Sequence, residues 1–371
     1  MRTGSTGSPR TSFDFGRAGE SSGFTSGDAL AEVTHNRVIA SAHPASSRIT
    51  QRAPPRIVGQ SAFIHARSPV LSSILSRIAL TLASWLARRS LATQARIGAT
   101  LGRLMLLSGG MRNRLRENLT QAGYAERVTL AQAAVGIGRM AIETVGLWRT
   151  PDEAVLARVK FVDGWDTVLA ARNAGRGVIF VTPHLGTFEV LSLFIGSQMP
   201  MTAMFRTPRV AWSEPMMRAG RDRMQIRSEP AGMSGIRAML KALRRGDTVG
   251  LLPDQVPDPG KGGEGVWADF YGRPAYTMTL AQKLAKTSGA LVVFMGCMRL
   301  PDAAGYRLVF TPLPPFSEDA VTSARELNAA VEAMIARAPD QYLWSYNRYK
   351  VPAGTLPDAE AASQRAAGDK S

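Results

Sequence analysis

The sequence predicts an α/β fold in which a mostly parallel central sheet is covered by helices. From Gly177 onward, short runs of apolar and β-branched residues, typical of buried strands, alternate with segments of helical periodicity. Pro or Gly follows several of these runs, and neither continues a regular element well. This alternation favours parallel strands joined by crossover helices. We further expect an N-terminal helical segment that associates with a membrane.

The two ends of the chain differ from its middle in composition. Residues 1–68 are rich in Ser, Gly, Arg and Pro and lack periodicity, so we expect a disordered N-terminal extension without a secretory signal. An alternative is that translation starts downstream of Met1. The polar tail at 353–371 is also expected to be disordered.

Residues 69–110 are expected to form one or more membrane-associated helices. Apolar residues recur at helical spacing from Leu71 to Leu86, Arg77 interrupts them and a pair of arginines ends the run. A second run, 97–107, carries Arg103. Arginines flanking an apolar stripe favour a helix lying in the bilayer interface. A soluble amphipathic helix and a single span over 68–87 are the alternatives.

Residues 111–352 are expected to form the α/β domain, and its predicted elements follow in order. Three helices come first, over 111–122, over 130–148, and from an N-cap at Asp163 to Ala174. Gly and Pro are frequent over 256–274, which predicts a long loop whose stretch 262–272 is a candidate lid or acyl-chain wall, or else a packed hairpin. The remaining predictions are strands 177–182, 201–205, 248–252, 290–296 and 305–310, and helices 187–198, 212–224, 234–245, 277–287 and 319–337.

The most informative stretch is the end of the first predicted strand. Pro183 ends the strand, His184 follows in a turn, and Glu189 lies in the first turn of the next helix. A carboxylate in that position can hold the imidazole in one tautomer, which makes His184 a candidate general base at the carboxyl end of a strand. The alternative is a histidine that only caps a helix. The other histidines all lie within 1–68.

Further candidate site residues follow the next strands. If strands 177–182 and 201–205 are neighbours, Arg206 lies at the same edge as His184 and can bind a phosphate or carboxylate. Asp254, after strand 248–252, could support His184, orient Arg206 or receive a hydroxyl; a plain turn residue is the alternative. Arg221 and Arg223 belong to a basic segment downstream, which is either a solvated face or part of an anionic-substrate site.

Composition restricts the chemistry further. A net charge of +16 indicates an anionic partner, such as nucleic acid, lipid headgroups or an acidic protein. A single cysteine and one histidine outside the extension argue against disulfides and metal sites, and neither a phosphate-binding glycine motif nor a serine nucleophile elbow is present. We therefore expect no metal or cofactor, and acyl transfer in which His184 activates a hydroxyl without a covalent enzyme intermediate.

The motifs, taken in order from Pro69 to Lys350, resemble those of the lipid A biosynthesis late acyltransferases, the lauroyl/myristoyl type within a wider group of glycerolipid-acyltransferase-like enzymes. Two departures concern substrate contacts: Thr207 separates Arg206 from Pro208, and Tyr346-Asn347 stands where the family often has a histidine. The matching pieces are Arg112–Leu119, His184–Glu189, Phe205-Arg206-x-Pro208 with Arg221-x-Arg223, Gly246–Gln255, Phe270–Thr277 and Gln341–Lys350.

The resemblance implies an enzyme of the bacterial inner membrane, active at the cytoplasmic face. It would move a fatty acyl chain from acyl carrier protein to a hydroxyl on the hydroxyacyl chain of a Kdo-bearing lipid A precursor, with no nucleic acid partner. By resemblance, His184 and Glu189 form the catalytic dyad, and Arg206, Asp254, Arg221 and Arg223 bind or support substrate. The alternatives are an acyltransferase for another lipid, such as a lysophospholipid or amino-acid lipid, and a non-catalytic basic protein that binds membrane or nucleic acid.

Overall fold

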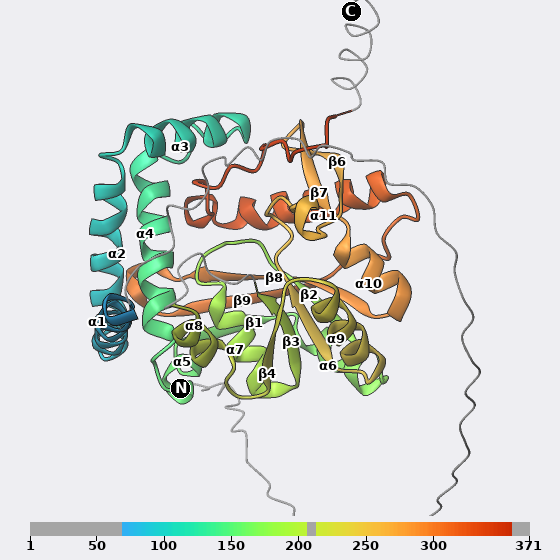
Figure 1. Cartoon of the computed structure of the whole chain (residues 1–371), viewed down its shortest axis with the longest axis horizontal. Coiled ribbons are helices and arrows are strands. Elements are labelled where there is room, and N and C mark those ends of the chain that lie inside the picture. Colours follow the sequence, from blue (N-terminus) through green and yellow to red (C-terminus); the bar gives the residue numbers. More distant parts are fainter. Residues whose placement is uncertain (1–68, 206–212, 358–371) are drawn as a thin grey trace, which may run out of the picture. The chain divides into compact units, whose positions relative to one another are not determined.

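The computed structural model describes residues 69–205 and 213–357, which lie in one compact unit of the chain. The predictions for the 1–68 extension, for Arg206 and for the end of the C-terminal tail fall outside these residues. The N-terminal helices α1 to α4 stand beside a central sheet, and the later helices cover its two faces (Figure 1). The predicted α/β class with a mostly parallel sheet is confirmed.

The central sheet has seven strands in the order β1-β9-β8-β2-β5-β3-β4. Every neighbouring pair is parallel except β8 and β9, which are antiparallel. Strand β2 lies in the middle and its four residues are all buried. The strands are β1 (Val159–Asp163), β2 (Val178–Val181), β3 (Met201–Phe205), β4 (Ile226–Pro230), β5 (Thr248–Leu251), β8 (Leu291–Arg299) and β9 (Tyr306–Pro312).

Three features of the sheet region differ from what the sequence predicted or what we assumed from it. Strands β1 and β4 were not predicted because both are edge strands: four of five residues of β1 are exposed, and β4 alternates exposed charges with buried residues. Asp163 ends β1 instead of capping a helix, and Gly164 precedes the next helix. Strands β2 and β3 are not neighbours, because β5 lies between them and pairs with both.

The predicted long loop contains an antiparallel hairpin of β6 (Gly265–Phe270) and β7 (Arg273–Met278). The stretch therefore forms a hairpin, and its role as a lid or acyl-chain wall stays a prediction. Because β7 reaches Met278, the following helix α10 begins at Leu280 and not at 277.

Two apolar clusters cover the faces of the sheet, as the two-residue period of buried strands requires. Ile179 and Val181 of β2 pack with α9 (Met233–Arg244), α10 (Leu280–Ser288) and α11 (Ala320–Arg337). Val178 and Phe180 point to the other face and pack with α6 (Trp165–Asn173) and α7 (Glu189–Gln198). Helix α8 (Glu214–Arg221) and the 3₁₀ turns Pro259–Lys261, Pro301–Ala303 and Pro339–Gln341 complete the elements.

The N-terminal helices pack closely on one another where glycines remove side chains. They are α1 (Pro69–Ala87), α2 (Leu91–Met105), α3 (Gly109–Gln121), α4 (Leu130–Leu147) and the short α5 (Asp152–Leu156). A Cβ at Gly138 of α4 would lie 2.1 Å from the carbonyl oxygen of Gly98 in α2, so only glycine allows this approach. Among the described helices, none is both long and apolar enough to cross a bilayer.

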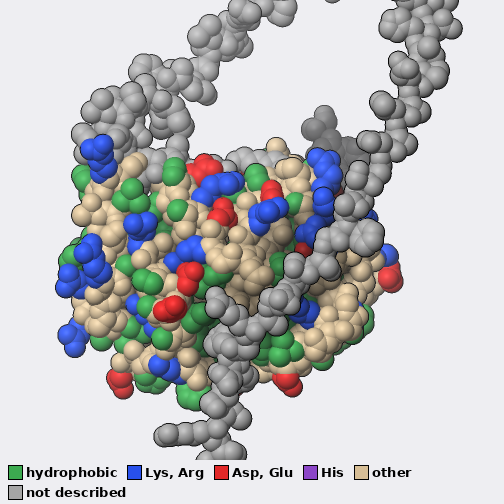
Figure 2. Space-filling model, turned by 90° about the horizontal axis from the view of Figure 1, so that it is seen from below, with side chains coloured by type: hydrophobic (Ala, Val, Ile, Leu, Met, Phe, Trp, Pro, Cys, Tyr) green, Lys and Arg blue, Asp and Glu red, His purple; other side chains and the backbone are tan. Residues whose placement is uncertain are grey.

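Large apolar side chains remain exposed on helix α1, on helix α2 and just after α2. Ile78 and Leu82 of α1 are more than half exposed, as are Leu104 of α2 and Leu107, which follows it. Figure 2 shows basic and hydrophobic side chains intermixed along the left edge of the molecule, the side on which these helices stand in Figure 1.

Candidate active site

His184 lies in a short segment that crosses the carboxyl edge of the sheet. The backbone N–H of Gly186 donates to the carbonyl of Gln341 at 3.0 Å, and that of Thr187 donates to the carbonyl of Cys297 at 3.3 Å. Gly186 has φ of +59°, and a Cβ there would lie 1.8 Å from the carbonyl oxygen of Cys297. Only glycine therefore fits, and the segment that carries His184 is fixed to β8 and to the C-terminal region.

Asp254 holds His184 at two points. Its Oδ1 lies 2.8 Å from the imidazole Nδ1, and its Oδ2 accepts the backbone N–H of His184 at 2.8 Å. The contact follows from sheet order, because β2 and β5 are parallel neighbours and their carboxyl ends meet at one edge. With Nδ1 occupied, Nε2 is the atom left for chemistry. The amide Nε2 of Gln255 lies 3.3 Å from it, and the Phe188 ring lies beside the imidazole.

The charge of Asp254 is stabilised although the carboxylate is buried. Burial raises the pKa of Asp254, but the adjacent His184 and the guanidinium of Arg348 outweigh this effect, and the pKa lies below its ordinary value. Arg348 is itself buried, and it donates to the carbonyl of Tyr276 and to Thr277. Burial and the neighbouring Asp254 raise the pKa of Tyr342, so its hydroxyl stays protonated. An ionised Asp254 stabilises a protonated imidazole.

Glu189 does not occupy the position that the sequence predicted. Its carboxylate pairs with Arg221, whose Nε lies 3.0 and 3.1 Å from the two oxygens, while Nη2 also contacts Oε1. The carboxylate on the imidazole is that of Asp254, which the neighbouring strand brings closer than the start of α7 does. Burial lowers the pKa of Arg221 but the ion pair with Glu189 raises it more, so the guanidinium stays charged. A catalytic role for Glu189 stays a prediction.

The other predicted arginines have different surroundings. Arg223 donates to the backbone carbonyls of Thr150 and Leu147 and pairs with Asp152 at 3.2 Å, so it holds the end of α4. Arg221 lines a small cavity of about 80 Å³ together with Glu189 and Thr182, which follows β2.

A buried network of charged and polar side chains contacts the His184 segment. No pattern in the sequence had indicated this network. Arg299, at the end of β8, pairs with Glu143 of α4 at 2.9 Å and donates to the carbonyl of Gly186 at 2.9 Å. The hydroxyl of Thr187 donates to the same Glu143. The available signal was a charged residue inside the apolar run of α4, since a charge is rarely fully buried without a partner.

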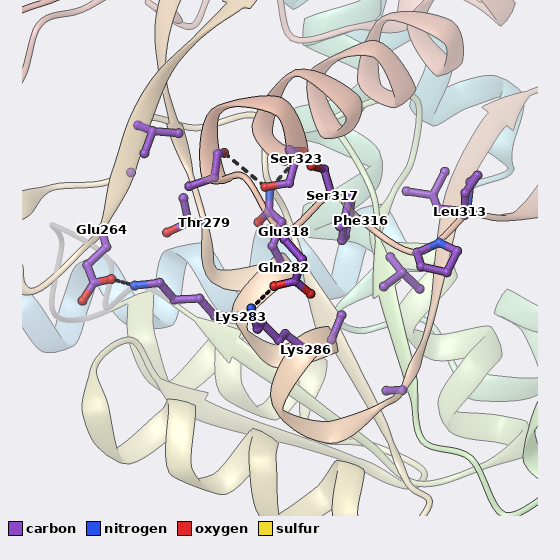
Figure 3. Close-up of a pocket in the computed structure, with 18 of the residues that line it drawn as sticks. Glu264, Thr279, Gln282, Lys283, Lys286, Leu313, Phe316, Ser317, Glu318 and Ser323 are labelled. Atoms are coloured by element: carbon purple, nitrogen blue, oxygen red, sulfur yellow. Dashed lines mark hydrogen bonds and ion pairs between the residues drawn. The ribbon is translucent and has the colours of Figure 1, made fainter.

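Two larger cavities lie beside α10. The first, about 1030 Å³, is bounded by α10, the β6–β7 hairpin and the start of α11. Figure 3 shows Lys283 pairing with Glu264 and Lys286 pairing with Glu318 at its walls. The second, about 530 Å³, lies between α9 and α10. Within the described residues, no group of three or more His, Cys, Asp or Glu side chains could hold a metal ion.

Comparison with known proteins supports an assignment for this arrangement. Residues 71–351 match the family model described as bacterial lipid A biosynthesis acyltransferase. The lipid A biosynthesis palmitoleoyltransferase of Escherichia coli K12 is 31% identical over 223 residues, covering 60% of this chain and 71% of that protein. The lauroyltransferase of the same strain is 30% identical over 231 residues, covering 60% of this chain and 72% of that protein. Its myristoyltransferase is 28% identical over 202 residues, covering 52% of this chain and 59% of that protein.

Breaking the buried Arg299–Glu143 ion pair should be strongly destabilising. We predict that Arg299→Met lowers the free energy of unfolding by about 3–5 kcal/mol, because it leaves the buried Glu143 without a counter-charge. Urea denaturation followed by circular dichroism measures this. Arg307→Met, which removes a largely exposed pair with Asp163 on the neighbouring strand, should cost less than about 1 kcal/mol. Equal losses for the two variants would contradict the prediction.

Proposed function

The chain belongs to the bacterial lipid A biosynthesis acyltransferases, and on that premise we propose that it moves a fatty acyl chain from acyl carrier protein to a hydroxyl on the hydroxyacyl chain of a Kdo-bearing lipid A precursor. Family membership makes the chain an acyltransferase of lipid A biosynthesis. The donor, the Kdo-bearing acceptor and the roles of single residues are the content of the proposal.

The observation that carries the mechanism is the bond between Asp254 and Nδ1 of His184. It leaves the ring lone pair on Nε2, which accepts the proton of the acceptor hydroxyl, in place of the hydrogen bond from the Gln255 amide, as the hydroxyl oxygen attacks the thioester carbonyl. The new ester C–O bond forms, the C–S bond breaks, and the imidazolium returns its proton to the leaving thiolate. The negative charge of Asp254 stabilises the imidazolium between these two steps.

In this proposal Arg221 supplies a positive charge that interacts with the anionic groups of the reaction. It is held by Glu189 and lies at the small cavity beside Thr182. A guanidinium there can stabilise the oxyanion of the tetrahedral intermediate or bind a phosphate of the acceptor. In this proposal Glu189 acts through Arg221 and Asp254 acts through His184. Arg206 keeps the role of an anion-binding residue that the sequence suggested.

We also propose that the enzyme works at the cytoplasmic face of the inner membrane, with α1 and α2 lying in the bilayer interface. The exposed apolar side chains of Ile78, Leu104 and Leu107 support this, because large apolar side chains beside basic residues are typical of helices that lie in a bilayer interface. Arg88 and Arg89 lie between the two helices, where they could contact lipid phosphates.

Transfer of a radiolabelled acyl chain from acyl carrier protein tests the proposed function. The purified protein should acylate Kdo-bearing lipid A precursor and leave lysophospholipid largely unmodified. His184→Ala should lower the rate by about 10²–10⁴-fold, the usual contribution of general base catalysis. Robust transfer to lysophospholipid with none to the precursor would contradict the assignment of a lipid A acceptor. An unchanged rate in His184→Ala would contradict the role of His184 as general base.

A double-mutant cycle distinguishes the two carboxylates. We predict that Glu189→Gln and Arg221→Met each lower kcat/KM by roughly 10–100-fold, as expected for a charged hydrogen bond, and that the double variant is no worse than either alone. Glu189→Gln and Asp254→Asn should instead combine multiplicatively. Coupling of Glu189 to Asp254, with independence from Arg221, would restore the direct contact with His184 that the sequence predicted.

Vesicle binding tests the membrane proposal. The double variant Leu104→Glu, Leu107→Glu should reduce co-sedimentation with vesicles containing anionic phospholipid by at least about tenfold. The reason is that two apolar side chains, exposed in the protein alone, would no longer be buried in the lipid. Leu169→Glu is a matched control, since Leu169 is also partly exposed but belongs to α6. A loss of binding as large in the control would argue against an interface formed by α1 and α2.

A further inference from the structure

We propose that the cavity between α9 and α10 holds the fatty acyl chain of the donor and that Leu240, at its far end, limits the length of that chain. The inference rests on the proposed function. The cavity has a volume of about 530 Å³, within the range of ligand-binding clefts.

The walls of this cavity suit a flexible hydrocarbon. Besides the charged Asp258, Glu264 and Lys283, they contain aliphatic side chains and methionines, and the thioether side chains of methionine adapt readily to a chain of variable shape. The apolar lining residues are Met204, Met233, Ile236, Leu240, Met278, Leu280 and Leu284.

The cavity begins at the edge of the sheet where His184 lies. Met204, near the carboxyl end of β3, lines both this cavity and the small one that contains Glu189 and Arg221. Pro257, also in the lining, comes two residues after Gln255, whose side chain approaches the imidazole. A chain attached to a thioester beside His184 can therefore enter between Met204 and Pro257.

The direction of helix α9 determines which of its residues lie deep in the cavity between α9 and α10. The helix joins the parallel strands β4 and β5, so it runs from the carboxyl edge of the sheet back toward the amino edge. Met233 at its start is near the entrance, and Leu240 is about 10 Å further along the axis at 1.5 Å per residue. The methyl end of a bound chain would thus meet Leu240.

The charge beside the cavity favours the donor as the source of the chain. Helix α9 has no acidic residue, and its exposed Arg237, Lys241 and Arg244 follow one side of the helix. Acyl carrier protein is acidic, so this face attracts the molecule that delivers the chain.

The larger cavity on the other side of α10 is a poorer match for hydrocarbon. Lys283 and Glu264 line both cavities, but the Lys286–Glu318 ion pair and Gln282, whose buried Oε1 has no hydrogen-bond partner among the described residues, line only the larger one (Figure 3). Met204 does not line it.

Competition between donors of different length tests the inference with the acceptor held constant. Acyl carrier proteins loaded with chains of 10 to 16 carbons are mixed with lipid A precursor, and products are counted by mass spectrometry. Leu240→Ala should shift the preferred chain about two carbons longer and Leu240→Phe about two shorter. Each shift should change the ratio of long to short products at least about tenfold, the effect of a methylene in a fitted pocket.

Leu243→Ala is the matched control. Leu243 lies on the same helix and is buried in the core, but it does not line the cavity, so its loss should leave the product ratio unchanged. A wild-type ratio in both Leu240 variants, or an equal shift in Leu243→Ala, would overturn the inference while wild-type transfer leaves the proposed function standing. If the wild-type protein transfers none of the donors, the proposed function itself fails.

Discussion

The site depends on one carboxylate that binds both the backbone and the ring of the same histidine. Asp254 fixes His184 by its peptide N–H and by Nδ1, so the turn and the imidazole are positioned together. This is possible only because β5 lies directly beside β2. The cost of burying Asp254 is offset by charges around it, including the buried Arg348. The position of His184 therefore depends both on the order of the strands and on Asp254 being ionised.

A second buried charge pair stabilises the same turn from the other side. Arg299 joins Glu143 of α4 to the carbonyl of Gly186, and the Thr187 hydroxyl completes the network. A buried ion pair often contributes little net stability compared with apolar packing, but it holds its partners in one geometry. Helix α4 thus connects the N-terminal helices, which carry the exposed apolar side chains, to the backbone beside the histidine.

The sequence predicted the fold class, the central strands and the importance of His184, because a buried parallel strand has a strong apolar pattern and a proline marked its end. Edge strands β1 and β4 were missed, since exposed strands carry the charged residues of a loop. Pairing Glu189 with His184 relied on proximity along the chain. The actual partner is Asp254, which the sequence analysis named as one possible support for His184; the choice between the two carboxylates follows from strand order, which local patterns do not encode. The Arg299–Glu143 pair, 156 residues apart, was beyond reach for the same reason.

The two edge strands that escaped prediction also affect how the molecule behaves at high concentration. An open strand can pair with the edge of another copy and begin aggregation. Here β4 presents the charged Arg227 and Glu229 and ends in Pro230, which has no N–H to donate. Strand β1 exposes Lys160 and Asp163 beside the apolar Phe161 and Val162, and the guanidinium of Arg307 lies over the Phe161 ring. Charge and a missing donor oppose sheet extension. The composition that hid these strands from a pattern search is the same one that keeps the sheet from growing between molecules.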